Sequence, residues 1–242
     1  MKHIQSQKSP HYSGNNNLEI MQIARNYNSF IANQILSLAP DDKHIKAYDF
    51  GAGTGQFTTI WRQFRKNKVD VSAIELDPDY RAVLRRKSLK IVNVENINKN
   101  SADLIYSVNV LEHIENDQEI FNLFFKKLKP GGRLFLYVPA FQFLWTKMDD
   151  AVGHVRRYQR QDLEQKLKLA GFKVENLEYA DSAGFFATLL ARSLIKGNGD
   201  LRPRLLLFFD RVLFPLGRVM DKLVLKHFLG KNLLVLAKKN LS

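Results

Sequence analysis

The chain has 242 residues, and its 37 Lys and Arg against 24 Asp and Glu give a formal net charge of +13. A composition of 45% apolar and 25% charged residues is typical of a globular protein, and the length allows one large domain. The chain has no cysteine, which excludes a disulfide scaffold, a thiolate zinc site and a cysteine nucleophile. The positive charge favours anionic partners but does not choose among them.

The first 17 residues are polar and rich in Ser, Asn and Lys. They lack the apolar core of a secretory signal, and we expect residues 1–17 to form a mobile arm before a single domain over 18–242. No run of 18 uncharged apolar residues occurs, so no membrane-spanning helix is expected. These features favour a cytoplasmic protein.

Apolar residues recur at helical spacing over 18–38, and Pro40 ends that pattern. Short strand patterns then alternate with helical segments, one of which begins at Asp77 as N-cap with Pro78 at the first position. The expected strands are 47–50, 69–74, 90–94, 103–108, 133–138, 172–179 and 233–237. This alternation predicts an α/β fold, with a doubly wound, mostly parallel sheet covered by helices on both faces.

About fifty mostly helical residues, roughly 180–231, are inserted before the last expected strand. One apolar stripe follows helical spacing, with basic residues beside it; the stripe comprises Leu216, Val219, Met220, Leu223 and Val224. Two interpretations remain open. The insertion is either a helical cap packed on the sheet, or a basic amphipathic face, about 200–229, that rests on a membrane or encloses a lipid-like substrate.

The first expected strand ends in Asp49-Phe50 and runs into a turn with glycine at positions 51, 53 and 55. Gly51, Gly53 and Gly55 remove side chains that would keep a ligand away from the backbone. A dinucleotide fingerprint, G-x-G-x-x-G, would need its third glycine at 56, where the chain has Gln56. This difference argues against a nicotinamide-dependent oxidoreductase.

Polar residues follow the next expected strands at the same edge of the sheet. Glu75 ends the second strand, where a carboxylate can accept hydrogen bonds from both hydroxyls of a ribose. Glu95 and Asn96 follow the third strand and are placed to bind an adenine edge, although a polar loop pair explains them as well. Asn109 follows the fourth strand.

Together these residues resemble the class I S-adenosylmethionine-dependent methyltransferases over about residues 18–179. The matching segments are Y-D-F-G-A-G-T-G at 48–55, A-I-E-L-D-P at 73–78, D-L-I-Y-S-V-N-V-L-E-H-I at 103–114 and L-K-P-G-G at 128–132. The resemblance implies a seven-stranded, Rossmann-like sheet whose last strand runs antiparallel. It also implies S-adenosylmethionine as the cofactor and S-adenosylhomocysteine as the product. We expect no metal.

The resemblance also assigns roles to the residues at the strand ends. It implies that Asp49 and the three glycines hold the methionine part of the cofactor and that Glu75 holds the ribose. The adenosine side would be held by Glu95, Asn96 and Asn109.

A second block resembles a narrower bacterial subgroup whose substrate is generally unassigned. The block comprises V-P-A at 138–140, Asp149, G-H-V-R-R-Y at 153–158 and A-G-F at 170–172. The inserted segment, including F-F-D-R at 208–211, also looks like this subgroup. Members often resemble proteins that handle sugars or polyprenyl lipids, which is a loose association.

Methyl transfer from a sulfonium is an in-line displacement, and a general base is needed only when the acceptor must lose a proton. The candidate catalytic residues are His154, His113 and Tyr158. His113 is also explained by packing at a helix start, and His154 by orientation of its loop. The candidate substrate-binding residues are Asp149, Arg156 and Arg157; both arginines are equally explained by loop-anchoring salt bridges.

A basic run spans 81–90 with few aromatic residues between its charges, as on a solvated helix face. No N/D-P-P-Y/F segment stands at Asn109, so nucleic acid is not the expected substrate. The favoured function is methylation, on oxygen, of a small or lipid-linked acceptor, anionic molecules included. The enzyme is expected in the cytoplasm or peripherally on the inner face of the membrane. The alternative is a non-catalytic S-adenosylmethionine-binding protein that docks a partner through its insertion.

Overall fold

The computed structural model describes residues 19–39, 44–64, 69–194 and 202–240. The expected N-terminal arm at 1–17 lies outside these residues. Among the described segments, none of the helices combines the length and apolar character needed to cross a bilayer.

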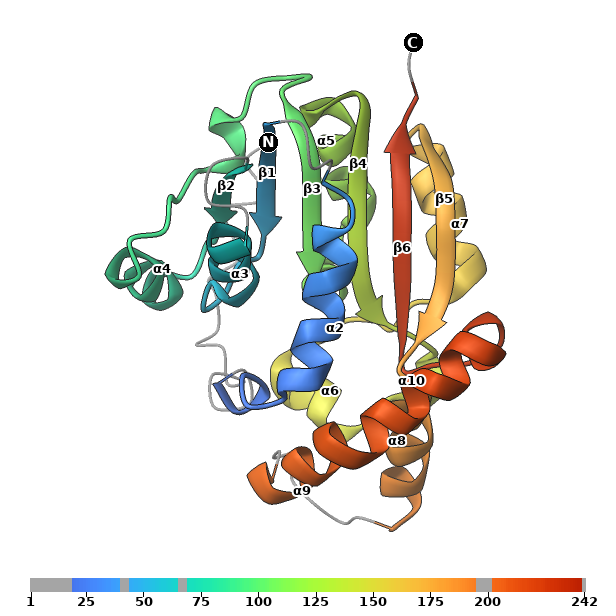
Figure 1. Cartoon of the computed structure of the whole chain (residues 1–242). Coiled ribbons are helices and arrows are strands. Elements are labelled where there is room, and N and C mark those ends of the chain that lie inside the picture. The colour runs from blue at the N-terminus through green and yellow to red at the C-terminus, as the bar shows by residue number, and fades with distance from the viewer. Residues whose placement is uncertain (1–18, 40–43, 65–68, 195–201, 241–242) are drawn as a thin grey trace.

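One sheet of six strands organises the protein, in the order β2-β1-β3-β4-β6-β5 (Figure 1). β1 pairs in parallel with β2 and β3, and β3 pairs in parallel with β4. β6 lies antiparallel between β4 and β5. The strands are β1 (Ile45–Phe50), β2 (Val69–Ile74), β3 (Ala102–Val108), β4 (Leu128–Pro139), β5 (Phe172–Ala180) and β6 (Asn232–Lys239). The expected mostly parallel α/β sheet with an antiparallel last strand is confirmed.

The expectation of a seventh strand at 90–94 is wrong. Ile91 makes only an isolated parallel bridge with Ala73. The Ala73 N–H donates to the Lys90 carbonyl at 2.8 Å, and the Val92 N–H donates to the Ala73 carbonyl at 2.9 Å. The chain then leaves the sheet edge, because Val94 turns into the core and begins the short 3-10 helix η1 (Val94–Asn96).

Helices α2 (Arg25–Leu36) and α3 (Gln56–Phe64) cover one face of the sheet. Ile31 of α2 and Trp61 of α3 are buried there in one apolar cluster with side chains of β1, β3 and β4. Tyr137 of β4 belongs to the same cluster and lies edge-on to Tyr27. This packing places the start of α2 near the carboxyl ends of the parallel strands (Figure 1).

Helices α5 (Asp117–Lys127) and α7 (Arg160–Leu169) pack against the opposite face. Phe121 of α5 and Leu163 of α7 are fully buried in the second apolar cluster, together with alternate side chains of β3, β4 and β6. Burial on both faces explains why the central strands are continuously apolar.

Helix α4 (Pro78–Arg86) begins as the sequence predicts. The Asp77 side chain accepts hydrogen bonds from the N–H groups of Asp79 at 2.8 Å and Tyr80 at 3.3 Å. Pro78 occupies the first helical position, where no intrahelical N–H is needed. This cap sets the direction of the chain directly after β2.

Between β5 and β6 the chain forms a group of helices at the carboxyl end of the parallel strands (Figure 1). They are α8 (Ser182–Leu194), α9 (Pro203–Phe208), the π-helix η4 (Phe209–Leu213), α10 (Phe214–Leu223) and the 3-10 helix η5 (Leu225–His227). We refer to these as the inserted helices.

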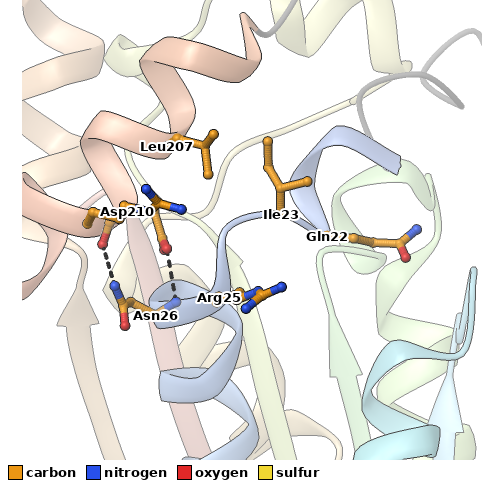
Figure 2. Close-up of a pocket in the computed structure, with 7 residues that line it drawn as sticks. Gln22, Ile23, Arg25, Asn26, Leu207 and Asp210 are labelled. Carbon is orange, nitrogen blue, oxygen red and sulfur yellow. Dashed lines mark hydrogen bonds between the residues drawn. The ribbon is translucent and has the colours of Figure 1, made fainter.

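Asp210 attaches the inserted helices to α2 (Figure 2). Its carboxylate accepts hydrogen bonds from the N–H groups of Asn26 at 3.0 Å and Tyr27 at 2.8 Å, although residues 26 and 210 are 184 positions apart. The first N–H groups of a helix have no partner within the helix, so this buried carboxylate caps α2 from another segment. Beside the contact lies an open pocket of about 540 Å³, lined in part by Ile23 and Leu207.

Candidate functional site

The glycine turn joins β1 to α3 at the carboxyl edge of the sheet. Gly51 and Gly55 have φ of +75° and Gly53 has +52°, a region that side chains disfavour. A Cβ added at Gly51 would lie 2.4 Å from a methyl group of Val110. The turn therefore requires glycine at 51 for both conformation and space.

Glu75 lies against this turn. One carboxylate oxygen accepts the Gly53 N–H at 2.7 Å, and the other accepts the N–H groups of Leu76 at 2.8 Å and Asp77 at 2.9 Å. The half-buried carboxylate therefore connects the glycine turn to the end of β2. The structure brings together Glu75 and a glycine of the turn, which the sequence placed only at one edge of the sheet.

Asp49 is buried at the end of β1, where Thr58 of α3 donates its hydroxyl hydrogen to the carboxylate at 2.6 Å. Burial raises the pKa of Asp49 from its ordinary 3.8 to about 7, because a charged carboxylate is poorly solvated there. The carboxyl group can therefore gain or lose a proton near neutral pH.

The candidates for the adenosine side lie on two exposed segments. Glu95 and Asn96 are exposed on η1. Arg81 ties this segment to β2, because its guanidinium donates to the Glu75 carbonyl at 2.8 Å and to the Asn93 side chain at 3.2 Å. Asn109 follows β3 with a φ of +53° and is exposed.

Asp149 is the centre of a buried polar network. Its carboxylate accepts two hydrogen bonds from the Arg157 guanidinium, at 2.8 and 2.9 Å, and one from His154 Nδ1 at 2.7 Å. Thr146 donates hydrogen bonds to the same carboxylate from its N–H and its hydroxyl group. Burial alone raises the pKa of Asp149, but the bonds from His154 and Arg157 outweigh it and hold that pKa well below its usual range.

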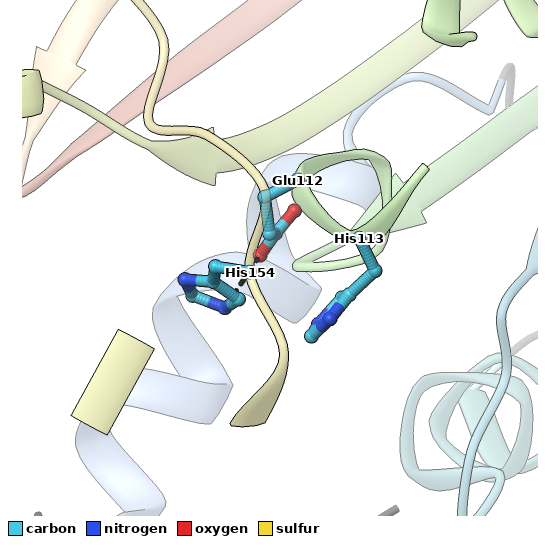
Figure 3. A group of neighbouring side chains, drawn as sticks. All are labelled: Glu112, His113 and His154. Carbon is cyan, nitrogen blue, oxygen red and sulfur yellow. Dashed lines mark ion pairs between the residues drawn. The ribbon is translucent and has the colours of Figure 1, made fainter. Parts of the chain in front are cut away.

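His113 and His154 meet edge-to-face, with ring centroids 4.7 Å apart (Figure 3). Glu112 lies beside this pair, and its Oε1 is 3.7 Å from His154 Nε2. Burial lowers the pKa of His113 to about 4 and raises that of Glu112 to about 8. Sequence reasoning missed Glu112, although it directly precedes a candidate histidine in the segment after β3.

Arg156 and Tyr158 both contact Asp117, at the start of α5. An Arg156 nitrogen lies 2.7 Å from the Asp117 carboxylate, and the Tyr158 hydroxyl donates to the same carboxylate at 2.9 Å. Burial raises the pKa of Tyr158 well above its ordinary value. These contacts, like those of Arg157, match the loop-anchoring alternative. Substrate binding and catalysis by these residues stay predictions.

Aromatic side chains gather where β4 and β5 end. Phe141 stacks on Tyr179 with ring centroids 4.8 Å apart and meets Phe185 of α8 edge-on at 5.7 Å. Phe143 contacts both Phe141 and Phe185 and is half-exposed. This aromatic cluster offers an apolar surface at the same edge of the sheet as the glycine turn.

A doubly wound sheet with an antiparallel last strand and a glycine turn after β1 defines the Rossmann-like methyltransferase fold. The family model for a methyltransferase domain matches residues 23–177. The chain belongs to this methyltransferase domain family, and the expected resemblance to methyltransferases is confirmed at the level of the family. The bacterial subgroup stays a prediction. The comparison with curated proteins found no match.

Solved structures share the fold at low identity. A chain from the complex of the Haloferax volcanii Trm112 methyltransferase activator with a methyltransferase is 13% identical, with a TM-score of 0.64; the match covers 95% of this chain and 96% of that chain. An S-adenosylmethionine-dependent methyltransferase of Archaeoglobus fulgidus is 15% identical, with coverage of 88% and 94% and a TM-score of 0.56.

A third similar structure is phosphoethanolamine N-methyltransferase 2 of Haemonchus contortus, solved with S-adenosylmethionine. It is 17% identical with a TM-score of 0.57, and the match covers 86% of this chain. The present chain spans about half of that enzyme's length, 52%. At these identities the likeness concerns the fold.

Proposed function

We propose that the protein is an S-adenosylmethionine-dependent methyltransferase. The observation that carries this proposal is the contact of the Glu75 carboxylate with the Gly53 N–H, in a turn whose backbone is left open by glycine. It occurs at the carboxyl edge of a doubly wound sheet, the usual place for a ligand in this class of fold. The match to the methyltransferase domain family supports it.

The residues at this edge fit the two ends of the cofactor. Glu75 would hold the ribose hydroxyls, because a carboxylate offers acceptors to both. Asp49, buried beside the turn, would attract the positively charged methionine end. Glu95, Asn96 and Asn109 would contact the adenosine side; their exposure leaves their polar groups accessible.

When bound, S-adenosylmethionine supplies an electrophilic methyl group. The protein's task is then to hold the acceptor in line with that group and to exclude water. An oxygen acceptor must lose a proton, and the depressed pKa of His113 keeps its imidazole neutral and able to accept one. The methylated atom we propose is oxygen, with His113 or His154 as the base.

The acceptor we propose is small or lipid-linked, with anionic molecules included. Two apolar surfaces support a lipid-linked acceptor. One is the aromatic cluster at the ends of β4 and β5. The other is the outer face of the inserted helices, where large apolar side chains are more than half exposed; they include Leu205, Phe208, Leu216, Val219 and Leu223. Basic residues of the same helices suit an anionic inner membrane face.

Isothermal titration calorimetry with S-adenosylmethionine tests the cofactor assignment. Glu75→Ala should weaken binding about ten- to a hundredfold, because charge-assisted hydrogen bonds contribute about 1.5–3 kcal/mol. The matched control is Glu175→Ala, on the exposed surface of β5, which should bind like the wild type. Unchanged affinity in Glu75→Ala, with the circular dichroism spectrum preserved, would remove Glu75 from the site.

Transfer of a labelled methyl group separates catalysis from simple binding. The protein is incubated with labelled S-adenosylmethionine and a cell extract, which is then divided into lipids and water-soluble small molecules. Label in either fraction supports the enzyme and identifies the acceptor class. Cofactor binding without label transfer favours the alternative, a binding protein that docks a partner through the inserted helices.

A further inference from the structure

Glu112, His113 and His154 form a compact cluster of potential metal ligands (Figure 3). One ligand atom from each residue lies within 4.8 Å of the other two. Glu112 and His113 belong to the 3-10 helix η2 (Leu111–His113), and His154 follows α6 (Lys147–Val152). The Val155 N–H donates to the Glu112 carbonyl at 2.8 Å and holds the two segments together.

The carboxylate of Glu112 gives an independent indication of a ligand. Its side chain is fully buried, and neither oxygen has a hydrogen bond to another residue in the part of the chain that the structure describes. Burying a carboxyl group without partners is costly, so native proteins rarely retain one without compensation. His154 Nε2, 3.7 Å from Oε1, shows that the carboxylate points toward the histidines.

Each of the two imidazoles is hydrogen-bonded through Nδ1, which leaves Nε2 as the atom that can bind a metal. His154 Nδ1 donates to the Asp149 carboxylate at 2.7 Å. His113 Nδ1 lies 3.2 Å from the Gly153 carbonyl, which can only accept, so Nδ1 carries the hydrogen. In each ring the lone pair is therefore on Nε2. Hydrogen bonds of this kind, from the second ring nitrogen to a carboxylate or carbonyl, accompany most metal-ligating histidines.

We propose that Glu112, His113 and His154 bind a divalent transition-metal ion, with Asp149 and the Gly153 carbonyl orienting the two histidines. Two imidazoles and one carboxylate suit Zn²⁺ and its neighbours in the first transition row better than Mg²⁺, which prefers oxygen ligands. Bonds of about 2.0–2.1 Å place tetrahedral ligands about 3.3 Å apart, so the farthest pair must close by about 1.5 Å. Side-chain rotation can supply that movement.

Three protein ligands leave a coordination position for water or another oxygen. An ion held by both Nε2 atoms would occupy the lone pairs that a general base needs, so His113 or His154 could act as the base only without the ion. The proposal departs from the expectation of a metal-free protein, and metal binding does not require the cofactor. Metal binding can therefore be measured in the absence of S-adenosylmethionine, and its failure would leave the proposed methyltransferase function untouched.

Calorimetric titration of chelator-treated, untagged full-length protein with ZnCl₂ tests the site. The wild type should bind one ion per chain, and Co²⁺ should give a visible absorption band that Zn²⁺ removes. Glu112→Gln, which keeps the side-chain volume, and His113→Ala should each lose at least about tenfold in affinity. His227→Ala, at an exposed histidine of η5, is the matched control and should bind like the wild type.

Thermal unfolding of each metal-free variant shows whether it folds. If one of the two ligand variants does not fold, the other still tests the site. Absence of saturable Zn²⁺ binding to the wild type would overturn the proposal. Equal affinity of the wild type and both ligand variants would also overturn it, because the ion would then be bound elsewhere.

Discussion

The buried carboxyl group of Asp49 makes the stability of the protein depend on pH in a predictable direction. Its pKa is about 7 in the folded protein and 3.8 for an ordinary aspartate. Between these values the unfolded chain has lost the proton and the folded protein still holds it. The stabilisation from this group is therefore complete below pH 3.8 and is lost as the pH rises to about 7.

The pKa difference of about three units corresponds to about 4 kcal/mol of unfolding free energy. The fall is about 1.4 kcal/mol per pH unit at most and becomes smaller near the folded-state pKa, so between pH 5 and 7 the wild type should lose about 2 kcal/mol through this group alone. Asp49→Asn cannot ionise, and its amide oxygen can still accept the Thr58 hydroxyl hydrogen. The variant should therefore lose about 2 kcal/mol less than the wild type over the same interval.

Urea unfolding at pH 5, 6, 7 and 8, followed by circular dichroism, measures the difference. Other buried carboxyl groups, such as Glu112 and Asp181, also have raised pKa values but contribute equally to both proteins, so subtraction removes them. Asp162→Asn, at an exposed carboxylate of α7, is the control and should follow the wild-type curve. Parallel curves for the wild type and Asp49→Asn would refute the reasoning.

Gly51→Ala should lower the unfolding free energy by about 1–3 kcal/mol, because it strains a φ of +75° and overlaps Val110. In urea unfolding, Val110→Ala should restore part of that loss; full stability of Gly51→Ala alone would contradict the steric argument. Separately, the protein should sediment with anionic but not neutral vesicles. The double variant Leu216→Ser/Leu223→Ser should reduce the sedimented fraction, whereas Leu169→Ser, equally exposed on α7, should not. No sedimentation of the intact protein would refute membrane contact.

Local sequence patterns were sufficient for most of the elements and for one edge of the candidate site. The spacing of apolar residues, together with the Pro and Gly residues that end helices, places the strands and helices within a few residues. These signals act over one or two turns of chain. The Asp77 cap and the glycine turn are equally local: each depends on hydrogen bonds or dihedral angles of adjacent residues. The strand expected at 90–94 is reduced to one bridge at Ile91, because Val94 turns into the core and the chain leaves the edge of β2.

Two features depended on contacts between distant parts of the chain, which no local pattern records. Asp210 caps a helix 184 residues away, and its sequence context does not identify that partner. The candidate residues at 153–158 also proved to have different neighbours, which only the structure shows. Arg156 and Tyr158 contact Asp117 of α5, whereas His154 packs against His113.

The sequence by itself determined the α/β class, the glycine turn, the acid after β2 and the resemblance to methyltransferases, because each depends on neighbouring residues. Only the tertiary structure decided that β6 lies between β4 and β5 and that Glu112 is buried without a hydrogen-bonding neighbour among the described residues. Burial and side-chain convergence are properties of the packed molecule. Folding brings together groups whose positions along the chain give no measure of their distance.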